Sequence, residues 1–202
     1  MLYSLKSYLK FLLASTNQHG VHSPFVYGLL TKCIYQKQHL EKQLPTLLAE
    51  QHPQSTKDFR FKKKQIIHYK IASYFKSNEI LILDKSILTK NLISLARPNS
   101  CITQTNDFIK KQVVEKKFDL VVINTTNNTQ HIGELFEKIL ESAHQNCVFI
   151  FEGIYTTKAT TKAWQAIVAS QKTTVSIDGF YLGLVFLKKD QEKQFYTQNV
   201  TL

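Results

Sequence analysis

Short apolar runs alternate with helical stretches from Glu79 onward, and this alternation constrains the fold more than any other feature of the chain. The apolar runs predict strands at residues 80–83, 101–105, 120–123 and 148–151. The helical stretches predict helices at residues 88–96, 107–116, 129–144 and 159–170. A terminal hairpin is expected from residues 174–177 and 182–187. Strand–helix–strand units build a mostly parallel sheet, so the expected class is α/β, with an antiparallel hairpin at its C-terminal end.

The residues before this pattern read as helical. The expected helices are residues 1–15, 24–35 and 58–75. Pro45 and Pro53 punctuate a linker that has room for at most one short helical turn. We therefore predict an N-terminal helical extension at residues 1–56 and an α/β domain at residues 57–202.

The first helix carries leucines at helical spacing. They are Leu2, Leu5, Leu9 and Leu12. This spacing predicts an amphipathic helix that packs on the body of the protein or on a protein partner. Lys6 and Lys10 interrupt every candidate apolar core, so the segment does not read as a signal peptide. No run approaches the roughly 18 apolar residues of a membrane span, and we expect a cytoplasmic protein.

The chain is strongly basic, with 26 Lys plus Arg against 15 Asp plus Glu and a net charge of +11. Such a charge attracts polyanions such as nucleic acids or acidic membrane surfaces. Arg60 and Arg97 are the only arginines, however, and arginine is the residue that reads phosphate and guanine in bidentate fashion. A solvated basic surface is favoured over specific nucleic-acid recognition. The oligomeric state is left open.

Residues 57–64 alternate aromatic and cationic side chains, as single-strand nucleic-acid binders do. On a helix Phe59 and Phe61 would point about 200° apart, so they would not form one stacking platform. The start of a helix with a solvated basic face is the favoured interpretation. His19 and His22 flank Gly20 without a neighbouring carboxylate or cysteine, which favours packing and capping over metal binding.

The three cysteines, Cys33, Cys101 and Cys147, have no paired spacing that would indicate a disulfide framework or a zinc site. Cys101 and Cys147 open apolar runs, so both are expected to be small buried residues with reduced thiols. A glycine-flanked serine elbow and a phosphate-binding glycine loop are both missing from the sequence.

Two segments resemble a family of class I S-adenosylmethionine methyltransferases found in Bacteroidetes. The first reads His19-Gly20-Val21-His22-Ser23-Pro24-Phe25-Val26-Tyr27, and the second runs from Trp164 through Ile177 and Asp178 to Phe186. The resemblance implies a Rossmann-like sheet that binds S-adenosylmethionine at the carboxyl ends of its first strands.

The family places an acidic residue in the first strand and glycines in the loop that follows, where the backbone approaches the cofactor. Here Ile82 stands at the acidic position, and Asp84, Ser86 and Leu88 fill the loop; no glycine lies between Gly28 and Gly133. We expect the side chains of Asp84 and Leu88 to occupy cofactor space.

The end of the second strand should carry a carboxylate that accepts hydrogen bonds from the ribose hydroxyls. Thr105 stands there instead, and Asp107 lies two residues too late, where a helix-capping role is favoured. Too few residues remain before residue 120 for a further strand and its crossovers, so we infer that the family's third strand is deleted. That strand lies at the sheet edge, and its loss would leave the core intact.

The resemblance implies an acidic residue near the transferred methyl group at the end of the family's fourth strand, and metal-dependent relatives add further carboxylates after the fifth. Asn124 and Glu152 stand at these positions and are weak catalytic candidates. One carboxylate beside an amide supplies too few oxygen ligands for magnesium or calcium. We therefore expect no metal site.

Three hypotheses follow. The first is a non-catalytic methyltransferase relative that binds no cofactor and contacts a protein through its N-terminal helices or through the basic helix expected at residues 58–75. The second is an active methyltransferase that uses backbone amides near residues 84–86 with the carboxylates Asp107 and Glu152. The third and weakest is a nonspecific nucleic-acid-associated protein.

Overall fold

A computed structural model of the chain describes residues 2–16, 20–36, 40–51, 65–105, 117–127, 132–188, 191–198 and 200. The predicted helix at residues 107–116 with Asp107, the basic segment at residues 57–64 and His19 lie outside these ranges.

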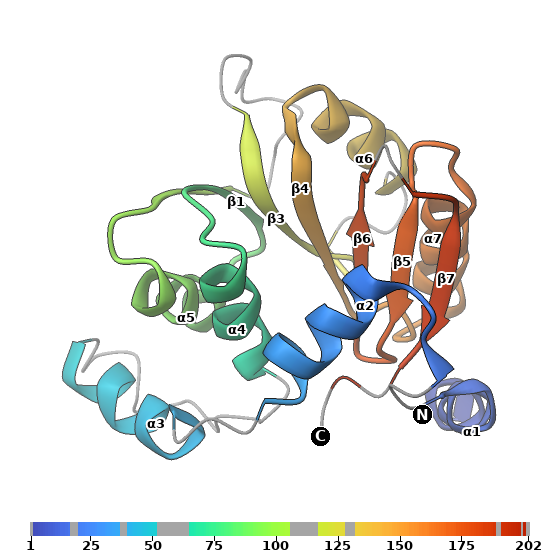
Figure 1. Cartoon of the computed structure of the whole chain (residues 1–202), viewed down its shortest axis with the longest axis horizontal. Helices are drawn as coiled ribbons and strands as arrows, with labels where there is room; N and C mark the ends of the chain where they lie inside the picture. Colours follow the sequence, from blue (N-terminus) through green and yellow to red (C-terminus); the bar gives the residue numbers. More distant parts are fainter. Residues whose placement is uncertain are drawn as a thin grey trace.

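The described residues form a seven-stranded sheet with the order β2-β1-β3-β4-β6-β5-β7 (Figure 1). Its strands are β1 (Glu79–Leu83), β2 (Cys101–Gln104), β3 (Phe118–Asn124), β4 (Ala143–Glu152), β5 (Val175–Asp178), β6 (Leu182–Phe186) and β7 (Gln194–Thr197). β2, β1, β3 and β4 run parallel, and β6 pairs antiparallel with both β4 and β5. The expected α/β class with its antiparallel hairpin is confirmed.

Helices cover both faces of this sheet. They are α1 (Leu2–Ala14), α2 (Pro24–Leu29), a π-helical segment η2 (Leu30–Ile34), α3 (Leu40–Gln51), α4 (Ile66–Tyr74), α5 (Ile87–Ala96), α6 (Ile132–Glu141) and α7 (Lys158–Ala169). Ser23 accepts a hydrogen bond from the Val26 amide and caps α2, as its position before Pro24 predicts.

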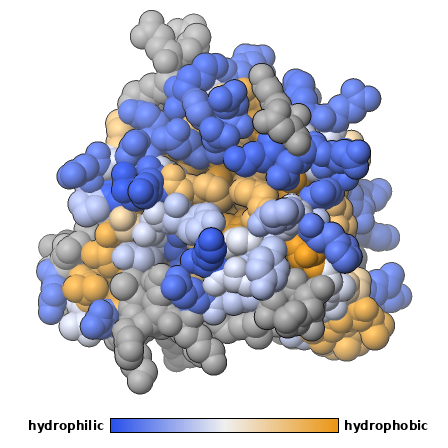
Figure 2. Space-filling model, in the orientation of Figure 1, coloured by the Kyte–Doolittle hydropathy of each residue, from blue (hydrophilic) through white to orange (hydrophobic). Residues whose placement is uncertain are grey.

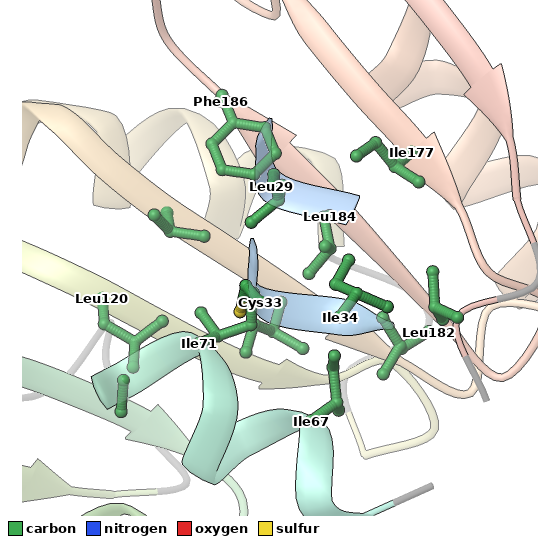
Figure 3. Packing of buried hydrophobic residues seen from close by; sticks show 14 of the residues in the cluster. Leu29, Cys33, Ile34, Ile67, Ile71, Leu120, Ile177, Leu182, Leu184 and Phe186 are labelled. Atoms are coloured by element: carbon green, nitrogen blue, oxygen red, sulfur yellow. The ribbon is translucent and has the colours of Figure 1, made fainter. Parts of the chain in front are cut away.

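Alternate residues along the central strands enter two separate cores, as the period of two in a strand requires. Ile80 and Ile82 of β1 join a cluster with α2, η2 and α4, which Figure 3 shows from close by. Leu81 and Leu83 face the opposite way and pack with α6 and α7. Of the helices before residue 57, α2 and η2 therefore share a core with the sheet, whereas α3 packs against α4 and α5 in a separate cluster.

Three elements differ from the predicted ones. β4 begins at Ala143, so His144 and the residues after it belong to a long strand and not to the preceding helix. α3 is a twelve-residue helix that contains Pro45, where the prolines predicted a linker. β7 was not predicted; it pairs parallel with β5 at the sheet edge. Within the described ranges no strand pairs with the outer side of β2, and the inferred loss of the family's third strand stays a prediction because residues 106–116 lie outside those ranges.

Candidate functional site

A cavity of about 730 Å³ lies at the carboxyl ends of β1, β3 and β4, beside the start of β6. Parallel sheets bind ligands at this edge because the loops that leave the strands diverge there. Its volume falls in the range of small-molecule sites, roughly 300–1,000 Å³. Four of the sequence-predicted residues line it: Asp84, Ser86, Asn124 and Glu152.

The loop after β1 satisfies its own polar groups. The Asp84 carboxylate accepts the Lys85 backbone N–H at 2.7 Å and the Asn127 side-chain amide at 3.1 Å, both on Oδ1. Ser86 accepts the Thr89 N–H at 3.2 Å and caps α5. Asp84 is only 7% exposed, so its carboxylate belongs to the wall of the cavity.

Gln104, the last residue of β2, ties that strand to the same loop. Its side-chain amide donates to the carbonyl oxygens of Asp84 at 2.8 Å and Ser86 at 3.2 Å. Thr105 follows it and donates its backbone N–H to Ile82 at 3.0 Å. The two strand ends are thus joined by hydrogen bonds across the position where the resemblance implies a ribose.

Leu88, which the sequence predicted to fill cofactor space, does not line the cavity. Its side chain is buried in a small cluster with Leu44 and Leu48 of α3 and Ile66 of α4. Ile82 is fully buried in the main core. Of the two positions that replace the family's glycines, Asp84 remains at the cavity, and Ser86 of the same loop also lines it.

His68 was missed by the sequence analysis and lies next to the cavity. Its ring is 1% exposed, and Nε2 lies 3.3 Å from Oε1 of Glu152 while Nδ1 lies 3.1 Å from the Gln65 carbonyl oxygen. The 3.3 Å approach is an ion pair without the alignment of a good hydrogen bond. A histidine within the otherwise apolar pattern Ile66, Ile67, Ile71 was the signal for a buried polar contact.

Burial and charge act in opposite directions on His68. Burial disfavours the imidazolium and is the largest single influence on its pKa. The Glu152 carboxylate, the Gln65 carbonyl and the charge of Asp84 together outweigh burial and raise the pKa of His68 above its ordinary value of 6.5. The His68 imidazole therefore links α4 electrostatically to the ends of β4 and β1.

Asn124 and Glu152 lie side by side on neighbouring strands, in register with one another. The Asn124 side-chain oxygen accepts from the Thr126 backbone at 3.1 Å and from the Thr126 hydroxyl at 2.6 Å. The Glu152 backbone oxygen accepts the Thr125 hydroxyl at 2.7 Å. Among the described residues no group of three or more His, Cys, Asp or Glu side chains could hold a metal ion.

Aromatic residues from two segments line the cavity, namely Tyr155 and the pair Phe180 and Tyr181. Phe180 adopts a left-handed backbone conformation, with φ of 65°, and packs against Tyr8 of α1 and against Tyr155. The Tyr155 hydroxyl donates to the buried Asp178 carboxylate at 2.5 Å. Burial raises the pKa of Asp178 above 3.8, although its hydrogen bonds oppose that shift. α1 is thereby held against the hairpin turn at the rim of the cavity.

Comparison with known proteins gives structural matches only. No protein-family model and no curated protein sequence matches the chain significantly. Its structure is similar to that of a protein assigned as a caffeoyl-CoA O-methyltransferase from Staphylococcus aureus, with a TM-score of 0.51 and 12% identity over 80% of this chain and 96% of that one. A protein assigned as an O-methyltransferase from Klebsiella pneumoniae matches with a TM-score of 0.50 and 9% identity over 81% and 96%. At these identities the likeness concerns the fold alone.

Proposed function

We propose that this chain, which has the fold of class I methyltransferases, is a non-catalytic member of that fold: it binds no S-adenosylmethionine and acts through contacts of its N-terminal helices. One observation carries the proposal. The polar groups of the β1 loop, which the resemblance assigns to the cofactor, are already paired with Asp84 and Gln104.

The pairing opposes the cofactor in two ways. A ligand carboxylate would have to displace the Asp84 carboxylate from the Lys85 N–H and then lie beside that negative charge. A ribose would have to break the two hydrogen bonds by which Gln104 holds the loop, and the amide would offer its hydroxyls a weaker acceptor than a carboxylate. The loop already forms these hydrogen bonds within the chain. Replacing them with hydrogen bonds to the cofactor would therefore add little binding free energy.

An active methyltransferase with an atypical pocket is the rival proposal. The observation in its favour is the cavity itself, which is large enough for a small ligand and has Asn124 and Glu152 in its wall. Its weakness is the source of the backbone amides, because the Lys85 N–H that it requires is bonded to Asp84. Cofactor binding separates the two proposals.

The decisive experiment is calorimetric titration with S-adenosylmethionine at about 1 mM, together with urea unfolding in the same ligand. A free ligand concentration of a hundred times the dissociation constant would raise the free energy of unfolding by about 2.7 kcal/mol. We expect no binding heat and an unchanged urea midpoint for the wild type. Micromolar binding by the wild type would overturn the proposal.

A paired set of variants tests the physical reason. In the structure Gln104, not Thr105, ends β2 with its side chain toward the β1 loop, so Asp84→Gly with Gln104→Asp frees the Lys85 N–H and places a carboxylate there. This double variant should bind the cofactor more tightly than the wild type does. Asn127→Ala is the matched control: it removes another partner of Asp84 while the loop hydrogen bonds of Lys85 and Gln104 stay in place. The control should bind no more cofactor than the wild type.

A further inference from the structure

α1 turns its aromatic residues inward and its leucines outward. Phe11 is buried, and both Tyr8 and Phe11 pack against Phe180. The outward face carries leucines with large exposed fractions: Leu5 59%, Leu9 55%, Leu12 43% and Leu13 89%. The leucine spacing predicted an amphipathic helix, but these leucines face away from the body of the protein. Figure 2 shows the resulting apolar patch at the lower right, where α1 lies in Figure 1.

Lysine side chains lie beside this leucine face. Lys6 and Lys10 are exposed on the same helix. With Lys158 and Lys193 they line a second cavity, of about 920 Å³, between α1, α7 and β7. The acidic residue in its wall is Asp178, which is 2% exposed and accepts the Tyr155 hydroxyl.

The sequence around α1 has the same bias. Residues 1–40 contain Lys6, Lys10, Lys32 and Lys37 and no aspartate or glutamate; the first acidic residue is Glu41. Exposed leucines beside lysines, with no acidic residue nearby in sequence, are the composition of a helix that lies in the headgroup region of an anionic bilayer.

We propose that α1 docks this protein on anionic membrane surfaces, with Leu5, Leu9, Leu12 and Leu13 in the outer acyl region and Lys6 and Lys10 beside lipid phosphates. This proposal rests on the proposed function in one respect, since both assign the contact role to the N-terminal helices. None of the described helices is long and apolar enough to cross a membrane, so the binding is peripheral.

A bilayer fits the outward face of α1 better than a protein partner does. Protein interfaces draw most of their energy from Trp, Tyr and Arg, and their cores are depleted in Lys. The aromatic residues of α1 instead contact other residues of the same chain, and its leucine and lysine side chains point outward. Lysine side chains suit a fluid headgroup layer because a long stem can carry its charge to the phosphates while the leucines enter the apolar region.

Co-sedimentation of the full chain with vesicles tests the proposal. We expect binding to vesicles of equal parts phosphatidylglycerol and phosphatidylcholine, weaker binding as salt rises, and little binding to phosphatidylcholine alone. Leu9→Asp with Leu13→Asp should lower the affinity at least about tenfold, because two apolar anchors become charges. Lys6→Glu with Lys10→Glu should also lower it at least about tenfold.

Matched controls exclude general effects of charge and of an exposed apolar residue. Ile87 is 56% exposed on α5, so Ile87→Asp makes the same kind of change as Leu9→Asp on another element. Lys90→Glu with Lys138→Glu changes the net charge as much as the α1 lysine variant does, at exposed sites on α5 and α6. Both controls should bind vesicles like the wild type. Urea unfolding, followed through Trp164, checks that each variant is folded.

Three results would overturn the proposal. One is a wild-type chain that stays in the supernatant with anionic vesicles. Another is a leucine variant that sediments as fully as the wild type. The third is a leucine variant that turns an oligomer into a monomer, because a second copy then covers α1 and the membrane is excluded. Cofactor titration is independent of all these outcomes, so the two proposals fail separately.

Discussion

His68 ties the stability of the protein to pH. Its pKa is raised in the folded chain above 6.5, so the folded state binds the proton more tightly than the unfolded chain does. The stabilisation is fully present below about 6.5 and is lost as pH rises through the folded pKa of His68. Asp178 has the same sign in a more acidic window that starts near 3.8.

Glu152→Gln should therefore destabilise the protein most below pH 6.5. The substitution removes the charge that opposes burial of the imidazolium, so we expect a loss of about 1–3 kcal/mol in the free energy of unfolding near pH 6. The difference from the wild type should shrink as pH rises through the pKa of folded His68. Urea unfolding from about pH 5.5 to about pH 9 measures it.

Glu137→Gln is the control for that experiment. Glu137 pairs with Lys172 on the surface, where both side chains are exposed, so its loss should cost little at any of these pH values. A difference for Glu152→Gln that is independent of pH would show that the carboxylate does not act through His68.

The three cysteines should react with thiol reagents at very different rates. Cys101 is exposed on β2, which corrects the expectation that it is buried, because an apolar run does not reveal that its strand lies at the sheet edge. Cys33 and Cys147 are buried; burial raises the pKa of Cys33 to about 12, against a smaller opposite effect of Lys70. In the native protein we expect one fast thiol in a 5,5′-dithiobis(2-nitrobenzoate) assay. Cys101→Ser should remove it, and three thiols of equal rate would contradict the burial.

At the scale of elements, Gly183 sets the distance between β6 and α7. A methyl group at position 183 would lie 2.4 Å from the ring of Trp164, a buried and rigid neighbour. Gly183→Ala should therefore lower the free energy of unfolding by about 1–3 kcal/mol, the usual cost of overpacking.

Gly28→Ala is its matched control. Position 28 lies in α2 with open space around the added methyl group, so the same substitution should raise stability by roughly 0.5–1 kcal/mol through helix propensity. Thermal or urea unfolding of both variants gives the comparison, and equal effects would show that contact with Trp164 is not the cause.

The sequence predicted best the elements whose pattern is local. β1, β3 and the hairpin are continuous apolar runs, and each was expected within a residue or two of its observed bounds. α3 was missed because Pro45, normally a helix breaker, lies inside it. β7 was missed because its residues are only half-buried at the edge, so no apolar run marks it.

At the scale of the whole molecule, the carboxyl ends of the parallel strands could be predicted as the site, but its internal hydrogen bonds could not. Asp84, Asn124 and Glu152 follow apolar runs, which locates them on one edge. The pairing of Gln104 with two carbonyls depends on a loop path that residue types do not encode, and His68 reaches Glu152 only because α4 crosses the sheet. The position of Leu88 away from the cavity could not be predicted for the same reason: its direction depends on how α5 packs under α3.

Thr16 and Gln198 pair as a parallel bridge, and their side chains bond across 182 positions of sequence. The Thr16 amide also donates to the Thr197 carbonyl. Gln198 is added by the ribosome 182 residues after Thr16. The leucine helix can therefore be fixed in this place only after the segment around Gln198 has been made, which makes its orientation depend on a late step of folding.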